Sequence, residues 1–396
     1  MVHASGCTQA SVIPSGANEH ALHTDLETQG PRMTNTATFF SQTYAQARTR
    51  FVAAAQGAGL MLESHGHPLR GRDGEALAMD VARLGAADAQ ALLLITSACH
   101  GVEGFCGSGV QNALLVDPHF HAAAARAGVA VLYVHALNPH GFSWWRRVTH
   151  ENVDLNRNWR NFNAPLPANT AYDSIAANLV PAVWPPTAEN EAVLAAYTAR
   201  HGAKGLQAAV TGGQYGHADG LFYGGRAPTW SHQTLRRVLR EHARSCSRLA
   251  WIDLHTGLGP NGHGERIFAG RDDPAALARA KAWWGPDITS TYDGSSSSAP
   301  LTGLMWMAAY EECPQAQYTG IAMEYGTVPV NDVIHALRED QWMQAHPEAR
   351  AADRAAAKQR IRDAFYTDTP FWKQRIVDQG VEVAMQAVAG LGLGRP

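Results

Sequence analysis

Four short apolar segments constrain the fold of this chain more than any other feature. Their length and their content of β-branched residues are those expected of strands buried on both faces of a sheet. The segments are Ala91–Ala98, Val129–Leu137, Leu249–Leu254 and Gly320–Met323. Because helix-like stretches separate them, the pattern predicts an α/β fold, a mostly parallel twisted sheet with helices on both faces.

The helix-like stretches show apolar residues at intervals of three to four, or a content rich in alanine. They include an amphipathic opening helix and two C-terminal helices around Pro370, which we expect to cap the sheet. The stretches are Thr38–Ala58, Asn112–Ala127, Glu189–His201, Thr234–Arg244, Glu348–Ile361 and Gln374–Ala389.

Polar or reactive side chains follow the carboxyl end of each apolar segment. His100 and Glu103 follow the first segment, Asn138 the second, His255 the third and Glu324 the fourth. In open α/β sheets the ligand crevice lies outside the carboxyl ends of the strands. The sequence therefore predicts one crevice that gathers these groups.

Composition indicates neither a nucleic-acid nor a membrane partner. Charged residues make up 17% of the chain and the net charge is -3. The five cysteines form no close pairs, which indicates reduced thiols and a cytoplasmic location. The first 33 residues contain no apolar run of seven or more, so they form no signal peptide. We expect residues 1–35 to be a disordered leader, with Met33 as an alternative start, and residues 36–396 to form a single domain.

The segment SACHGVEGFCGSG places His100 and Glu103 three residues apart in a glycine-rich turn after a strand. An imidazole and a carboxylate at this spacing can reach one ion, and His255 in WIDLHTGLG would be the third ligand. A catalytic zinc typically takes three such ligands and leaves one position for water. An HxxE pair alone is more often structural, but together with His255 it predicts one Zn²⁺ per chain.

Residues 138–159, NPHGFSWWRRVTHENVDLNRNW, are dense in guanidinium and amide groups. Arg146 and Arg157 present forked donors that suit a carboxylate or a developing oxyanion. Asn156 could share the same carboxylate, and Arg147 is the alternative to Arg146. A solvated basic loop is the ordinary interpretation of such a cluster, but the flanking tryptophans and the neighbouring zinc motif favour a binding role.

Two carboxylates complete the candidate site. Asp154 could fix the tautomer of a zinc-binding histidine, with a turn cap as the equally weighted alternative. Glu324 in YTGIAMEYGT follows an apolar strand, where a charge without a partner is costly. In a zinc hydrolase, a carboxylate in this place would act as the general base on a metal-activated water.

Five motifs, in this order, resemble the zinc carboxypeptidase superfamily, which includes the aspartoacylase and succinylglutamate desuccinylase branch. They are HGVE, WRR, NVDLNRNW, the histidine of DLHTG and the glutamate of MEYGT. Four longer segments resemble a bacterial subgroup, domain of unknown function 2817, and extend the likeness over about Thr38–Leu391. They are FFSQTYAQARTRFVAAA, GGQYGHADGLFYGG, TSTYDGSSSSAPLTG and EECPQAQYTGIAMEYGT. The resemblance implies a mixed, mostly parallel sheet between helices.

The resemblance also implies roles for individual residues. The metal ligands are those named above, Arg146 stabilises an oxyanion, and Glu324 is the catalytic acid and base. Asn156 and Arg157 recognise a terminal carboxylate. Carboxypeptidases also use a mobile tyrosine, for which this chain offers three loop candidates, Tyr215, Tyr223 and Tyr292.

The predicted function is carboxypeptidase-like hydrolysis of an amide bond next to a free carboxylate, in a small peptide or an N-acyl amino acid. An alternative is deacylation of small N-acyl amino acids, because the long loops at residues 162–186 and 212–229 would narrow the site. A third hypothesis, from another class, is a catalytically silent zinc- or ligand-binding protein. Glu324 argues against it, since a binding protein needs no general base beside the metal.

Overall fold

The computed structural model describes residues 35–393, which lie in one compact unit, Asn35–Pro396. The predicted leader, apart from Asn35, and the alternative start at Met33 lie outside the described residues. The four cysteines within that part of the chain are free and buried. None of the described helices has the length and the apolar character needed to cross a membrane.

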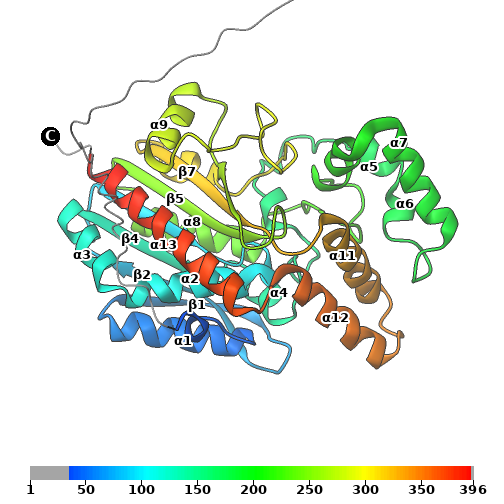
Figure 1. Cartoon of the computed structure of the whole chain (residues 1–396), viewed down its shortest axis with the longest axis horizontal. Helices are drawn as coiled ribbons and strands as arrows, with labels where there is room; N and C mark the ends of the chain where they lie inside the picture. Colours follow the sequence, from blue (N-terminus) through cyan, green and yellow to red (C-terminus); the bar gives the residue numbers. More distant parts are fainter. Residues whose placement is uncertain (1–34, 394–396) are drawn as a thin grey trace, which may run out of the picture. The chain divides into compact units, whose positions relative to one another are not determined.

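A seven-stranded mixed sheet forms the centre of this unit (Figure 1), in the order β1-β2-β4-β3-β5-β7-β6. The four central strands are parallel: β4 (Val129–His135), β3 (Ala91–Thr96), β5 (Arg248–Thr256) and β7 (Gln317–Tyr325). The outer strands are antiparallel to their neighbours: β1 (Met61–Arg70), β2 (Ala76–Leu84) and β6 (Gly264–Phe268). The predicted α/β fold with a mostly parallel sheet is confirmed.

The four predicted strands are the four central ones, because burial on both faces leaves continuous apolar runs. The sequence does not predict the three outer strands, which lack such runs. Strand β1 contains Gly66 and Pro68, and its register with β2 shifts between Gly66 and Arg70. Strand β2 is interrupted by Asp80 and Arg83, both buried with hydrogen-bond partners. Strand β6 has only five residues.

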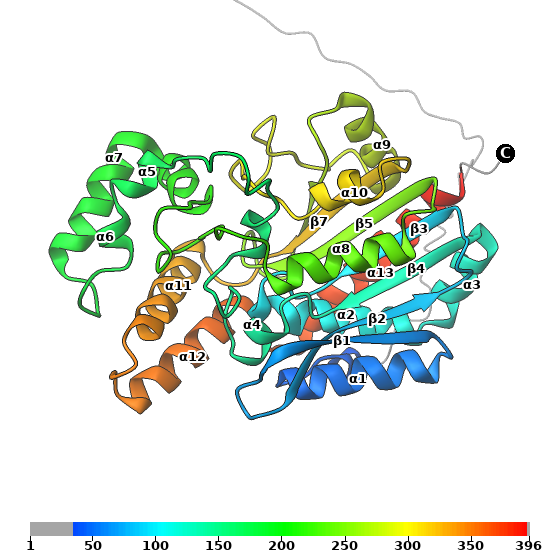
Figure 2. The ribbon, with the colours of Figure 1, turned by 180° about the vertical axis from the view of Figure 1, so that it is seen from behind.

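Helices cover both faces of the sheet. Figure 1 shows α13 running across one face, where it contacts α2, α3 and α9. Figure 2 shows α8 on the opposite face. The helices of the first face are α1 (Tyr44–Gly57), α2 (Gly104–Val116), α3 (Pro118–Ala127), α9 (Pro274–Trp284) and α13 (Pro370–Gly392). Those of the second face are α8 (Trp230–His242) and α10 (Met307–Glu312).

Further helices gather beyond the carboxyl ends of the central strands (Figure 1). A second apolar core, which includes Leu194, Phe222, Leu337 and Phe365, joins all of them except α4. They are α4 (Pro139–Ser143), α5 (Thr170–Asp173), α6 (Ala176–Leu179), α7 (Ala188–Thr211), α11 (Val330–Ala345) and α12 (Ala351–Phe365). This second layer of helices encloses the region where the sequence predicts a crevice.

Several predicted helices form with different boundaries, for local reasons. The stretch Asn112–Ala127 divides into α2 and α3 because Asp117 caps a new helix that starts at Pro118. Pro370 is the first residue of α13, which lies on the sheet as expected. The other C-terminal helix, α12, packs against α11 instead of capping the sheet.

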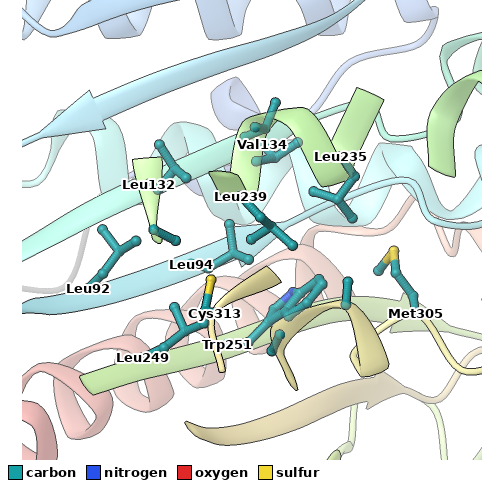
Figure 3. Packing of buried hydrophobic residues seen from close by; sticks show 14 of the residues in the cluster. Leu92, Leu94, Leu132, Val134, Leu235, Leu239, Leu249, Trp251, Met305 and Cys313 are labelled. Atoms are coloured by element: carbon teal, nitrogen blue, oxygen red, sulfur yellow. The ribbon is translucent and has the colours of Figure 1, made fainter. Parts of the chain in front are cut away.

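The main core lies between the sheet and α8 (Figure 3). Leu94 from β3 and Trp251 from β5 meet Leu235 and Leu239 of α8, and all four side chains are almost fully buried. Each such side chain contributes about 1.5–3 kcal/mol relative to leaving it exposed. The indole of Trp251 donates a hydrogen bond to Thr96 Oγ1 at 2.8 Å, so this core reaches the carboxyl end of β3.

A short turn, η2 (Gly101–Glu103), follows β3 and is fixed against the segment after α4. The backbone N–H of Gly101 donates to Arg147 O at 3.0 Å, and that of Val102 donates to Arg146 O at 2.9 Å. A Cβ at Gly101 would lie 2.1 Å from the carbonyl carbon of Gly141. Only glycine therefore allows the two backbones to come this close.

We expect Gly101→Ala to destabilise the fold by about 1–3 kcal/mol, the usual cost of forcing extra volume into a packed site. Gly57→Ala is the matched control, because a Cβ there has nothing within 4 Å. Urea denaturation of both variants measures the difference. Equal stabilities would show that the two segments are not in contact as described.

Candidate metal centre

His100, Glu103 and His255 converge between the carboxyl ends of β3 and β5 and are buried. The Nδ1 atoms of the two histidines lie 3.2 Å apart. His100 Nδ1 lies 2.9 Å from Glu103 Oε1, and His255 Nδ1 lies 3.0 Å from Glu103 Oε2. Strands β4 and β5 pair with opposite edges of β3, so the three residues lie where the strand order reverses.

These three groups fit a divalent metal ion. Ligands of a tetrahedral zinc at the usual bond lengths lie about 3.3 Å from one another. The three distances above are close to that value. Two imidazole nitrogens and a carboxylate are also the donor set of many catalytic zinc sites.

Two further carboxylates hold the other nitrogens of these histidines. Asp154 Oδ1 lies 3.2 Å from His100 Nε2, and Asp253 Oδ2 lies 2.6 Å from His255 Nε2. Asp253 in turn accepts a hydrogen bond from Thr96 Oγ1 at 2.5 Å. A carboxylate that accepts a hydrogen bond from Nε2–H favours the tautomer whose Nδ1 is unprotonated and can bind a metal ion.

The electrostatics of the group are dominated by burial and close charges. Burial opposes ionisation of Glu103, but His100 and then His255 hold the pKa of its carboxyl well below the usual range. Burial likewise opposes the charge on Asp154, yet Arg147 and Arg157 keep its pKa well below normal. Both carboxylates are therefore ionised at neutral pH.

Glu324 lies at the end of β7, in register with His255 of β5. Its Oε1 accepts a hydrogen bond from the backbone N–H of Leu258 at 2.9 Å. Burial, and then the negative charge of Glu103, raises the pKa of Glu324 to about 8. A carboxyl group with a raised pKa in a cleft is a candidate for proton transfer.

A pocket of about 670 Å³ opens onto this group. His100, His255 and Glu324 line it, together with Asn156 and apolar residues from the sheet and from the second core. Volumes of this size are typical of sites for small molecules.

Comparison with known proteins places the chain in a family. The model of a family described as a protein of unknown function, DUF2817, matches residues 40–379. The chain belongs to this family. No curated protein matches the DUF2817 chain.

Several solved structures are similar to this DUF2817 protein, all at low identity. A putative carboxypeptidase A from Shewanella denitrificans is 13% identical, with a TM-score of 0.42, over 88% of this chain and 70% of the other. A metallo-carboxypeptidase from Burkholderia cenocepacia is 14% identical, with a TM-score of 0.41, over 87% and 68%. An aspartoacylase family protein from Mesorhizobium loti is 15% identical, with a TM-score of 0.32, over 72% and 66%.

The two adjacent arginines of the DUF2817 protein face different surroundings. Arg146 is buried, with its Nε 3.1 Å from Asp340 Oδ2 and its Nη2 2.9 Å from Gln341 Oε1. Arg147 lines the pocket of about 670 Å³, whereas Arg146 is not among the described residues that line it. Arg147 Nη1 lies 3.1 Å from Glu103 Oε1. The structure therefore brings Arg147, the alternative in the sequence, to the candidate metal ligands and leaves Arg146 outside the group.

Asn156 and Arg157 both line the pocket, but they are already engaged. Asn156 Oδ1 accepts a hydrogen bond from the backbone N–H of Met305 at 2.9 Å. Arg157 donates from Nε and Nη2 to Thr211 O, at 3.0 and 2.6 Å, and from Nη1 to its neighbour's carbonyl. Three of the five N–H groups of this guanidinium are thus used within the chain.

Only one of the three candidate tyrosines lines the pocket in the described structure. Tyr292 does so, is 48% exposed, and donates from Oη to Gly270 O at 2.9 Å. Tyr215 and Tyr223 are buried, and Tyr215 Oη donates to Arg157 O. Their placement indicates a role in packing.

Sequence reasoning did not identify Asp253 as part of the site. The signal was present, since Asp253 lies on the predicted strand and His255 follows it directly, so that in an extended chain the two side chains lie on one face of the sheet. Thr96 carried no comparable signal, because its neighbour across the sheet depends on the pairing of β3 with β5.

We expect Asp253→Asn to weaken Zn²⁺ binding about 10- to 100-fold, the usual effect of removing a carboxylate from a metal-binding histidine. The amide keeps the shape but no longer favours the Nε2-protonated tautomer of His255. Competition with a chromogenic chelator measures the affinity, with exposed Asp88→Asn as the control. Unchanged affinity would mean that Asp253 does not orient the ligand.

Proposed function

We propose that this protein is a zinc-dependent hydrolase of an amide bond next to a free carboxylate, acting in the manner of a carboxypeptidase. The observation that supports this most is the buried group of two Nδ1 atoms and one carboxylate, 2.9–3.2 Å apart, beside Glu324 in a pocket. The motif order of the zinc carboxypeptidase superfamily supports the same function.

His100, Glu103 and His255 would hold the ion. When bound, Zn²⁺ supplies Lewis-acid chemistry, polarising a carbonyl group and making a water molecule easier to deprotonate. The charge on Glu103 offsets part of the charge of the ion. Asp154 and Asp253 keep the two imidazole rings in the orientation that points Nδ1 at the ion.

Glu324 would move the proton. Its Oε1 is held by the N–H of Leu258, while Oε2 has no hydrogen-bond partner among the described residues. We assign Oε2 as the atom that takes a proton from water and passes it to the leaving nitrogen. General acid–base catalysis of this kind contributes about 10²–10⁴-fold to the rate.

Arg147 would stabilise negative charge on the substrate. In the structure its Nη2 lies 2.8 Å from His100 Nε2. When His100 Nε2 is protonated and donates to Asp154, it cannot also accept a hydrogen bond from Arg147. The Nη2–H of Arg147 then becomes available to an oxyanion. A donor aimed at a developing oxyanion is worth about 10²–10³ in kcat.

The pocket indicates the size and character of the substrate. Its walls carry apolar side chains such as Leu206, Phe268 and Leu337, while its cations are Arg147, Arg157 and Lys204. A small amide with an apolar group and one carboxylate matches both features. Short peptides and N-acyl amino acids meet this description, so deacylation of small N-acyl amino acids remains the second candidate.

We expect the Glu324→Gln variant to bind zinc at His100, Glu103 and His255 as the wild type does. Its kcat should be at least 10²-fold lower, because glutamine cannot take up the proton. A panel of short peptides and N-acyl amino acids, followed by amine release, measures the activity. Elemental analysis checks the metal, and exposed Glu348→Gln is the matched control. Full activity in Glu324→Gln would contradict the mechanism, and zinc binding without turnover of any substrate would favour the binding-protein hypothesis.

We expect Arg147→Lys and Arg146→Lys to fail in different ways. Arg147→Lys keeps a cation near Asp154 but loses the fork, so kcat/KM should fall about 10²-fold. Arg146→Lys weakens the buried contacts to Asp340 and Gln341, so it should lower Tm and leave kcat/KM nearly unchanged. The reverse result would restore Arg146 to the oxyanion role.

A further inference from the structure

We propose that the chain has a second binding site for a divalent transition-metal ion, formed by Glu63, His65 and Glu241, with His242 beside Glu63. Glu63 and His65 belong to β1, and the other two residues end α8. Glu63, His65 and Glu241 each offer a ligand atom within 4.8 Å of the others. None of the four residues lines the large pocket described above.

The placement of Glu63 and His65 follows from the strand. They are two residues apart in β1, so their side chains lie on one face of the sheet. Both are partly buried, and Ser64 between them is exposed. This is the face that α8 covers (Figure 2), and the C-terminal end of α8 brings His242 to the carboxylate of Glu63.

The observation that points to a ligand is a pair of imidazole nitrogens without hydrogen bonds. His242 Nε2 lies 3.2 Å from Glu63 Oε1, and the side chain of His242 is only 8% exposed. His65 Nε2 lies 3.8 Å from Glu63 Oε2. Both Nε2 atoms are buried, and neither has a hydrogen-bond partner among residues 35–393.

Buried polar atoms are almost always satisfied, and an exception calls for an explanation such as an ion. His65 Nε2 lies 3.8 Å from Glu63 Oε2, and an ion bound to His65, Glu63 and Glu241 would fill this gap. His242 Nε2 faces the other oxygen of Glu63. Glu241 adds a second carboxylate from the solvent side. An imidazole with two carboxylates suits Zn²⁺ and its transition-metal neighbours better than Mg²⁺ or Ca²⁺, which prefer oxygen alone.

Such an ion would join two elements that the sheet itself does not connect. Strand β1 lies at one edge of the sheet and pairs only with β2 among the described strands. An ion shared between β1 and α8 would hold the edge of the sheet to the helix that covers it. The second site is therefore expected to act on stability and not on catalysis.

The test is the zinc stoichiometry of the full-length chain, freed of metal with a chelator and titrated with Zn²⁺ by calorimetry. We expect about two ions per wild-type chain. His65→Gln and Glu63→Gln should each bind one ion and keep the hydrolytic activity. His255→Ala should also bind one ion but lose the hydrolytic activity. Zn²⁺ should also raise the Tm of His255→Ala, and this rise should disappear when His65→Gln is added.

The matched control is His119→Ala, which removes an exposed histidine from α3. It should bind as many ions as the wild type. The proposal is overturned if wild type binds a single ion that is lost in His255→Ala, or if Glu63→Gln and His65→Gln leave the stoichiometry unchanged. A single ion lost in His65→Gln but kept in His255→Ala would support this site and contradict the catalytic one, so the two proposals fail separately.

Discussion

The buried carboxylate of Glu103 is the group around which the candidate site is organised. A charge with almost no exposure is stable only when its oxygens have partners. His100 and Arg147 face Oε1, while His255 and the backbone N–H of Thr256 face Oε2. These partners come from three separate segments, the turn after β3, the segment after α4 and the end of β5. The carboxylate therefore requires all three segments to be in place before the site exists.

The parallel pairing of β3 with β5 supplies the geometry for this convergence. The two strands are in register from Ala91 with Arg248 to Thr96 with Asp253, so they end at the same level of the sheet. Their side chains alternate, which places Trp251, Asp253 and His255 on one face. One hydrogen-bond path, from Trp251 through Thr96 and Asp253 to His255, thus links the apolar core to a candidate metal ligand. The core and the site share the same strands.

The sequence predicts the parts of this arrangement that local pattern determines. The central strands have continuous apolar runs, and each ends in a polar group, so the positions of His100, His255 and Glu324 follow from the sheet alone. The choice between Arg146 and Arg147 does not follow, because adjacent residues differ only in which side of the segment they face. That choice depends on Asp340, which lies 194 residues further along the chain. Outer strands such as β6 are equally hard to predict, since one neighbour supplies most of their stability.

The charge balance of the site gives an independent argument for a divalent cation. Four carboxylates, Glu103, Asp154, Asp253 and Glu324, face two guanidiniums, Arg147 and Arg157, and all six groups are within or beside the pocket. Fully ionised, they carry four negative charges against two positive ones, and a Zn²⁺ ion makes the sum zero. Without it, protons take its place: Asp253 and Glu103, against the effect of burial, hold the pKa of His255 well above its usual range, and burial raises that of Glu324. His255, which would bind the ion, and Glu324, which would act as the base, are the two groups that take up these protons. Proton uptake and metal binding are therefore competing ways to neutralise one buried cluster.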